Sequence, residues 1–423
     1  MLHNSRKLII VRREMPATVP VKDLDSLLQQ TLGPDLKVQN SKWKPLTAPG
    51  ENYGSLIYSV DASVERNKEI ESLHLVVKLP PPSAYLLDLF NSPLCFRKEL
   101  VYYRDIVPVF TELQFETNIE DNKIIRLMPQ YYGGRLGSED PNVFDNQAAI
   151  VMENLISVGY YVRDRLLGLD LDHTELVIEG LAKLHAIVIA LKIRKPDFFR
   201  ETVIPALVHT ANETAMEAVR GMLKEAHDVY KQLPEAKPFL DRIDKTLKYD
   251  YETDWRTFKS TEPWGTMVHN DFWSNNVLFK YSEKGKPVSI KIVDFQLGHY
   301  NSGALDLIFF LLTSAQEEVL DNHLDDMLDF YYKSFIDCLM TLNVDTTNFT
   351  RTDFHKEINR CAPCKFGQCA MMTNIIKAPR GAVKNIEAID KDVSFSAVGN
   401  GEGVQRRLLH ILGVFVKKRW LAD

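Results

Sequence analysis

The sequence predicts an α+β fold in two lobes: a small antiparallel-sheet lobe with one helix over residues 1–155, and a larger, mainly helical lobe over residues 156–423. Strand-like segments and turn residues alternate in the first lobe, and helical spacing of apolar residues dominates the second. One strand-rich interruption falls at 267–294. A chain of 423 residues also exceeds one small core and fits two or three domains or lobes.

Composition narrows the functional classes. Hydrophobic residues make up 45% and charged residues 26%, which is ordinary for a globular protein. A formal net charge of -6 argues against nucleic acid as a partner, because phosphate binding needs a basic surface. The amino terminus has too few clustered aliphatic residues for a secretory signal, and no apolar run approaches a membrane span. We therefore expect a cytoplasmic monomer without nucleic-acid or membrane partners.

Five cysteines are too few and odd in number for a disulfide framework, so we expect reduced thiols. Cys361, Cys364 and Cys369 resemble half of a zinc site. No fourth ligand with the right spacing follows, and zinc needs four. The favoured interpretation is that they are small apolar residues of a helix.

The small lobe begins with a predicted β-hairpin. Residues 50–60 indicate a glycine turn running into a strand, and residues 72–79 a second strand. The polar residues 61–71 are interpreted as their connection. A helix is predicted over 92–108, with Pro108 just past its end, and further strands within 124–134 and 146–155.

In the large lobe, Asp172 and Glu175 have the spacing of a capping box at a helix start. Five apolar residues then repeat with 4-3-4-3 spacing, which predicts a buried stripe. They are Val177, Leu181, Leu184, Val188 and Leu191. Further helical patterns cover about 210–248, 323–342 and 404–420.

The strongest chemical signal is VHNDFWSNNVLF (268–279), followed by SIKIVDFQ (289–296). The two predicted strands between these motifs would form a hairpin around a polar Gly-Pro turn. That hairpin would place Asn276 next to Asp294, with Asp271 on the same rim. Hard oxygen ligands at this density suit Mg²⁺, and phosphoryl transfer needs a metal together with a carboxylate that orients the attacking hydroxyl.

A second signal lies upstream. Lys78 ends an apolar strand, and Glu99 lies on the inward face of the following helix. A Lys–Glu pair would hold the lysine over nucleotide phosphates. The turn at 50–55 could lie over the same phosphates with its backbone N–H groups.

Each of these features has an ordinary alternative. Lys78 could be a strand-end lysine reaching water, Glu99 a solvated helix residue, and Asn276 a turn residue. The glycine turn lacks a full G-x-G-x-x-G motif. The order of all of them along one chain is far more specific than any single one.

Taken together, the motifs resemble the ecdysteroid kinase-like family, a choline-kinase-like branch of the kinase-like phosphotransferases. The resemblance covers about residues 20–415 and rests on GENY (50–53), Phe96/Glu99/Tyr103, ENL (153–155), LAKLHA (181–186), HNDFWSNN (269–276) and DFQ (294–296). It implies a bilobal protein-kinase-like fold, a nucleotide-binding lobe and hinge over residues 1–155, and a helical lobe over residues 156–423 that holds the catalytic loop, the metal loop and the acceptor pocket.

The resemblance also implies roles for individual residues. The implied cofactors are ATP and Mg²⁺. Asp271 would orient or deprotonate an acceptor hydroxyl, within a catalytic loop that includes His269 as a scaffold. The implied metal ligands are Asn276 and Asp294. Nucleotide contacts would come from Asn52, Ser55, Lys78 with its partner Glu99, and the hinge residues Met152, Glu153 and Asn154. Asp306 would order the catalytic loop, and His185 would be a packed helix residue.

One residue departs from the family pattern. Asn270 stands where glycine is usual, and asparagine is the best substitute where φ must be positive. We expect activity to be retained.

The acceptor is predicted to be a small molecule with a hydroxyl. A long helical segment separates Leu155 from His269, and D-F-Q replaces the D-F-G of protein kinases. The leading hypothesis is an ATP- and Mg²⁺-dependent kinase of a lipophilic alcohol, an ecdysteroid or a xenobiotic. A choline- or ethanolamine-type kinase and a weak pseudokinase remain alternatives. Five aromatic residues are candidates for the acceptor wall: Trp273, Phe309, Phe310, Tyr331 and Tyr332.

Overall fold

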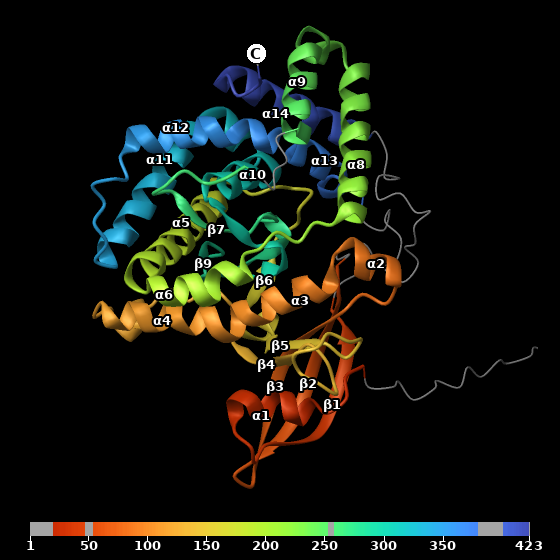
Figure 1. The fold of residues 1–423 in the computed structure, drawn as a ribbon, viewed down its shortest axis with the longest axis vertical. Helices are drawn as coiled ribbons and strands as arrows, with labels where there is room; N and C mark the ends of the chain where they lie inside the picture. Colours follow the sequence, from red (N-terminus) through yellow and green to blue (C-terminus); the bar gives the residue numbers. More distant parts are fainter. Residues whose placement is uncertain (1–19, 47–53, 253–257, 380–400, 423) are drawn as a thin grey trace, which may run out of the picture.

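The computed structural model describes residues 20–46, 54–252, 258–379 and 401–422. A sheet-containing part lies at one end of the long axis and most of the helices at the other (Figure 1). The predicted α+β class, with an antiparallel amino-terminal sheet and a helical carboxy-terminal region, is confirmed. Among the described residues, no helix combines the length and the apolar character that crossing a membrane requires.

The first sheet has five antiparallel strands in the order β1-β2-β3-β5-β4. The strands are β1 (Lys37–Pro45), β2 (Leu56–Arg66), β3 (Glu69–Leu79), β4 (Tyr131–Arg135) and β5 (Ala149–Glu153). Strands β2 and β3 pair along their whole length, and only Asn67 and Lys68 connect them. The predicted connection over residues 61–71 was too long, because all but Asn67 and Lys68 belong to the two half-exposed strands β2 and β3, whose outward-facing residues are polar.

Helices cover both faces of this sheet. Helix α1 (Leu24–Leu32) packs its leucines against one face, beside Val77 and Val151. It lies so close to β4 that a Cβ on Gly133 would stand 1.9 Å from the carbonyl oxygen of Leu27. On the other face, Phe96 and Leu100 of α3 (Ser92–Val101) pack with Ile150.

Helix α3 does not end at Pro108 as predicted. It passes through a π-helical turn, η1 (Tyr102–Ile106), into α4 (Val107–Glu116). Pro108 is therefore the second residue of α4, directly after the π-helical turn. The short helix α2 (Ala84–Leu89) precedes α3.

The helical region is built around α5 (Leu171–Arg194), whose predicted stripe is buried. Asp170 caps this helix by accepting from the N–H of His173, so the capping box predicted at Asp172 was two residues off. The other helices are α6 (Pro196–Phe198), α7 (Ile204–Ala206), α8 (Glu213–Gln232), α9 (Leu240–Glu252), α10 (Ala304–Ser314), α11 (Glu317–Thr341), α12 (Arg351–Cys361), α13 (Phe366–Ile376) and α14 (Glu402–Lys418).

Two small sheets interrupt the helices. Strand β7 (Gly265–Val268) pairs with β10 (His299–Ser302), and β8 (Val277–Tyr281) pairs with β6 (Tyr160–Val162) and β9 (Pro287–Ile292). The predicted hairpin at 277–293 is confirmed, with Val277 opposite Ile292. The predicted catalytic motif (269–276) and metal motif (294–296) adjoin the ends of these strands and therefore lie close together.

Candidate active site

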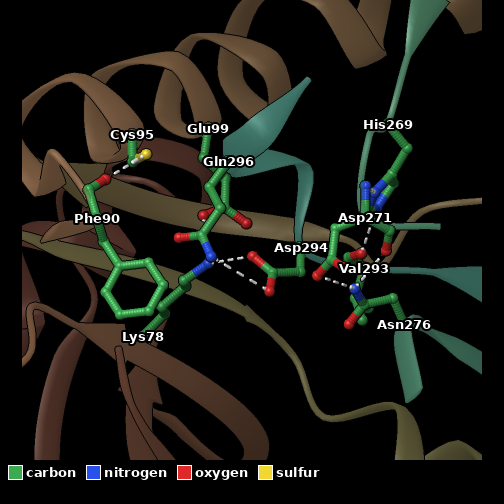
Figure 2. A network of polar contacts seen from close by, with 10 residues as sticks. All are labelled: Lys78, Phe90, Cys95, Glu99, His269, Asp271, Asn276, Val293, Asp294 and Gln296. Atoms are coloured by element: carbon green, nitrogen blue, oxygen red, sulfur yellow. Dashed lines mark hydrogen bonds and ion pairs between the residues drawn. The ribbon is translucent and has the colours of Figure 1, made fainter. Parts of the chain in front are cut away.

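Lys78 lies between two carboxylates at the end of β3. Because side chains alternate along a strand, Val77 faces α1 and Lys78 faces α3. Its Nζ is 2.6 Å from Glu99 Oε2 and 2.6 Å from Asp294 Oδ1 (Figure 2). The predicted Lys78–Glu99 pair is thus present, and both side chains are almost fully buried.

Burial governs the electrostatics of this triad. Burial lowers the pKa of Lys78, but the charges of Asp294 and Glu99 outweigh it and raise that pKa above its ordinary value. Burial raises the pKa of Glu99, and the charge of Lys78 opposes the rise. Lys78 is therefore a firmly protonated cation in a place that water barely reaches.

The hairpin brings Asn276 and Asp294 together as expected. The N–H of Val293 donates to the carbonyl oxygen of Asn276 at 3.1 Å, so Asp294 follows directly beside it. Asn276 Nδ2 donates to the carbonyl oxygen of Asp271 at 2.8 Å and to its Oδ2 at 3.1 Å (Figure 2). Asp271, Asn276 and Asp294 all line one cavity, and their carboxylate and amide oxygens are the donors that a hard divalent cation prefers.

Asp271 has the chemistry of a base near neutral pH. Burial and the nearby charge of Asp294 raise its pKa to about 6, although hydrogen bonds from Asn276 and Trp273 oppose the rise. The carboxylate therefore ionises within the range where a general base operates well.

Asp306 supports the catalytic loop from behind. Its two carboxylate oxygens accept the backbone N–H groups of His269, at 2.5 Å, and Asn270, at 2.9 Å. Burial raises the pKa of Asp306, but contacts with His185 outweigh it and lower that pKa below the usual range. Asn270 itself has φ 66°, the left-handed conformation in which asparagine replaces glycine at least cost.

His269 is a positioning residue by its contacts. Its Nε2 donates to the carbonyl oxygen of Val293 at 2.9 Å and its Nδ1 accepts from the N–H of Asp271 at 3.4 Å. It is fully buried and is not among the residues that line the cavity. His185 is packed as expected, and in addition its Nε2 lies 3.4 Å from Asp306 Oδ2, a support that no sequence motif indicated.

Some of the predicted nucleotide-binding residues line the cavity and others do not. Asn52 lies outside the described residues. Ser55 is buried and does not line the cavity, whereas Gly54 does. The hinge residues Met152, Glu153 and Asn154 do line it.

Two of the hinge N–H groups already have partners. The N–H of Glu153 donates to Gln130 and that of Asn154 donates to His74. These two N–H groups are therefore not available as donors to a base bound at this segment.

The cavity has a volume of about 1080 Å³, and it joins the hinge, the Lys78 triad and the catalytic loop in one space. Away from the hinge its walls are α8 and α13, which pack against each other. Most side chains there are aliphatic or thioether, with four methionines, Met216, Met222, Met371 and Met372, and the polar exceptions are Arg220 and Gln368. No motif marked these residues in the sequence.

The predicted aromatic wall was mostly wrong. Of the five candidates only Trp273 lines the cavity. Phe309, Phe310 and Tyr331 are buried in the core, and Tyr332 donates to the carbonyl oxygen of Phe349. Large aromatic side chains fill the interior of the helical region, because burial there removes the most apolar surface from water.

The cysteines form no metal site in the described part of the chain. All five are free thiols, and no cluster of three or more His, Cys, Asp or Glu residues that could hold a metal occurs there. This agrees with the interpretation of Cys361 and Cys369 as buried helix residues.

A strand lysine paired to a helix glutamate, and a hairpin with Asn276 and Asp294 at its two ends and Asp271 in the loop before it, define a kinase-like phosphotransferase. The sequence matches the ecdysteroid kinase-like family over residues 49–344, which is most of the chain, and the protein belongs to that family. The family resemblance seen in the motifs is thereby confirmed. No curated protein matches the sequence.

Several solved structures are similar over most of their length. A Plasmodium vivax ethanolamine kinase is 12% identical, with 89% of this chain and 83% of that chain covered and a TM-score of 0.43. The amicoumacin kinase hAmiN, solved with AMP-PNP and Ca²⁺, is 10% identical, with 89% and 88% covered and a TM-score of 0.39. A microcompartment-associated aminopropanol kinase is 11% identical, with 93% and 98% covered and a TM-score of 0.38. Similarity this distant says nothing about the substrate.

Proposed function

We propose that this protein transfers the γ-phosphoryl group of ATP to a hydroxyl of a small, largely apolar molecule, with an ecdysteroid or a xenobiotic alcohol as the leading candidate. One observation carries the proposal: the Lys78 triad and the Asp271–Asn276 pair open into the same cavity, whose far walls are mostly apolar side chains of α8 and α13.

The roles follow from these positions. Lys78 would contact the nucleotide phosphates while Glu99 holds it. Asn276 and Asp294 would hold Mg²⁺, which neutralises charge on the transferred group when it is bound. The raised pKa of Asp271 supports this fit. Repulsion from the charge of Asp294 contributes to the rise, and a bound cation would relieve that repulsion. Asp271 would accept the hydroxyl proton.

The apolar walls favour an uncharged acceptor. Burial of an apolar molecule against them contributes roughly 25 cal/mol per Å². A desolvated charge would instead need a partner in the wall. The choline- or ethanolamine-type kinase remains the alternative within the enzyme class. A pseudokinase has no need of Lys78, Asp271, Asn276 and Asp294 in this arrangement.

The test is a screen of metabolite extracts with γ-labelled ATP, followed by side-by-side turnover of an ecdysteroid, choline, an aminoglycoside and a peptide mixture. We expect label on the ecdysteroid or another neutral alcohol. Efficient turnover of choline or peptide, with none of any sterol or phenol, would show that the acceptor class is wrong.

A further inference from the structure

His299 opens strand β10 and lies beside the start of the catalytic loop. In the pairing of β7 with β10 it stands opposite Val268, and Val268 directly precedes His269. The side chain of His299 lines the same cavity as Asp271. Its imidazole therefore borders the part of the cavity that lies next to the catalytic loop.

His299 is buried, and the described part of the chain leaves one of its ring nitrogens without a hydrogen bond. Only 7% of the residue is exposed, and Nδ1 is the nitrogen without a partner there. The ring of His209 lies alongside, with the two ring centroids 5.0 Å apart. A half turn of the imidazole about the Cβ–Cγ bond exchanges Nδ1 with Cδ2 in place, so a nitrogen can meet a ligand from either orientation. Buried polar groups are almost always paired, so an unpaired one at a cavity wall indicates a ligand or water.

The imidazole of His299 is a neutral hydrogen-bonding group. Burial lowers its pKa well below the usual value, helped by the charges of His209 and Lys365. The charge of Asp306 opposes this and that of Lys98 adds to it, and the direction stays downward. A neutral imidazole has one N–H donor and one acceptor nitrogen. It therefore suits an oxygen of a ligand, either a hydroxyl or a carbonyl.

An acceptor without a second polar group would leave this imidazole unsatisfied. Water that enters the free cavity can hydrogen-bond the ring, and an apolar molecule that fills the cavity displaces that water. A buried polar group that loses its partner costs far more than an ordinary hydrogen bond gains. Most side chains of α8 and α13 that line the cavity are apolar and offer no replacement. An oxygen of the acceptor itself would remove the penalty.

We infer that His299 is an acceptor-binding residue that hydrogen-bonds a second oxygen of the acceptor, apart from the hydroxyl that receives the phosphoryl group. This rests on the proposed function, because it takes the space beside Asp271 as the acceptor site. The acceptor class thereby narrows from apolar alcohols in general to apolar molecules with at least two oxygen groups. Alcohols with a single oxygen bind at a penalty even where their shape fits.

A steroid series isolates the second oxygen. Androstan-3-ol carries one hydroxyl group, on ring A, and a set of androstanediols adds a second hydroxyl on ring A, B or D of the same rigid skeleton. Dissociation constants are measured by fluorescence titration on the full chain, with and without a non-hydrolysable ATP analogue. Binding is read directly, so the preference for a second oxygen is tested even if no steroid is phosphorylated.

We expect one of the diols to bind the wild type at least about five-fold more tightly than androstan-3-ol. His299→Phe keeps a ring without nitrogens and should abolish this preference, while androstan-3-ol binds at least as tightly as before. A merely structural role of His299 would weaken both alcohols alike. His299→Gln, whose amide donates and accepts, should retain part of the preference.

His410→Phe is the matched control. Nδ1 of His410 also lacks a hydrogen bond in the described part of the chain, but His410 lies in α14 and is not among the residues that line the cavity. The change should leave the preference for the diol as it is in the wild type.

Ring nitrogen NMR on the wild type, with nitrogen-15 in its histidines, gives a second measurement. The preferred diol should shift the ring nitrogen signals of His299, which are assigned by their absence from the spectrum of His299→Phe. His299→Leu serves for the assignment and the titration if the phenylalanine variant does not fold. Unchanged signals of His299 in the presence of the diol would contradict the contact.

Three results of the titrations would overturn the inference: androstan-3-ol bound by the wild type as tightly as every diol, a preference that His299→Phe leaves unchanged, or no binding of any of these alcohols. Weaker binding of the ATP analogue by His299→Phe, with the preference unchanged, would instead assign His299 to the nucleotide. Turnover of the preferred diol with ATP is measured in parallel. Absence of phosphoryl transfer in every form, with the expected preference and its loss in His299→Phe, would count against the proposed function alone.

Discussion

At the scale of single residues, Lys78 neutralises two carboxylates that are otherwise close to each other. Glu99 is fully buried, and its Oε1 has no hydrogen-bond partner in the structure. A strand-end lysine that reaches water, which was the ordinary alternative for Lys78, would contribute little to stability. The structure shows that it is only 2% exposed, so its loss leaves buried negative charge uncompensated.

Lys78→Met should therefore abolish phosphotransfer and also destabilise the fold, by roughly 3–5 kcal/mol near neutral pH. In this variant, burial and Asp294 raise the pKa of Glu99 without opposition from Lys78. A raised carboxyl pKa makes the folded state less stable as pH rises above the usual range of glutamate. Denaturant unfolding at several pH values checks this, and a variant as stable as wild type at neutral pH would contradict it.

Asp271 should impose a pH dependence on the reaction. Its pKa of about 6 predicts that kcat/KM for ATP, which reports the enzyme before Mg²⁺ and nucleotide bind, rises with pH through that value and then levels, because only the ionised carboxylate accepts a proton. Asp271→Asn should cut kcat by at least roughly 10²-fold and remove this step, with ATP binding nearly intact. The thermal midpoint should not fall, since a buried charge is removed. Loss of ATP affinity with unchanged kcat would show the role to be wrong.

At the scale of elements, the packing of α1 against β4 requires glycine at position 133. A Cβ on Gly133 would collide with the backbone of Leu27, which cannot move away as a flexible side chain can. Helix α1 would have to lift from the sheet, and Leu27 and Leu28 would lose part of their burial.

Gly133→Ala should therefore destabilise the protein by about 1–3 kcal/mol or more, measured by chemical unfolding. Gly221→Ala is the matched control, because Gly221 lies in α8 with nothing within 4 Å of a new Cβ. Alanine there should raise stability by roughly 0.5–1 kcal/mol through its better helix propensity. Equal effects of both changes would contradict the close packing of α1.

At the scale of the whole molecule, the nucleotide is expected to join the two lobes, since the cavity is lined from both. Lys78 and Met152 come from the first sheet, and Asp271 and Asp294 from the loops of the helical region. A ligand that binds only this folded arrangement stabilises it by mass action.

ATP with Mg²⁺ should raise the thermal midpoint, by the equivalent of about 2.7 kcal/mol at a ligand concentration of 100 Kd. Asp294→Asn should lose the Mg²⁺-dependent part of this rise and all Mg²⁺-dependent turnover, because a neutral amide cannot offset the charge of the phosphates. Thermal shifts with ATP, with and without Mg²⁺, in both proteins check this. A full Mg²⁺-dependent shift in Asp294→Asn would rule out the metal role.

The sequence alone was enough to predict the residues of the candidate site that belong to short local motifs. A strand-end lysine, a helix glutamate and a hairpin are read from short spacings, and the hairpin then brings Asn276 beside Asp294 by backbone pairing. Strand and helix boundaries were less accurate. A half-exposed strand carries polar residues that resemble a loop, and a π turn lets a helix continue past Pro108.

Only the tertiary structure shows which residues line the cavity away from the hinge. Helices α8 and α13 meet there from distant parts of the chain, and Lys365 reaches Asn270 across a sequence separation of 95 residues. Apolar side chains at helical spacing look the same whether they face the core or a cavity, so no local pattern separates Phe309 from Met371. The sequence likewise does not distinguish Lys365, which folding buries, from a lysine that stays exposed.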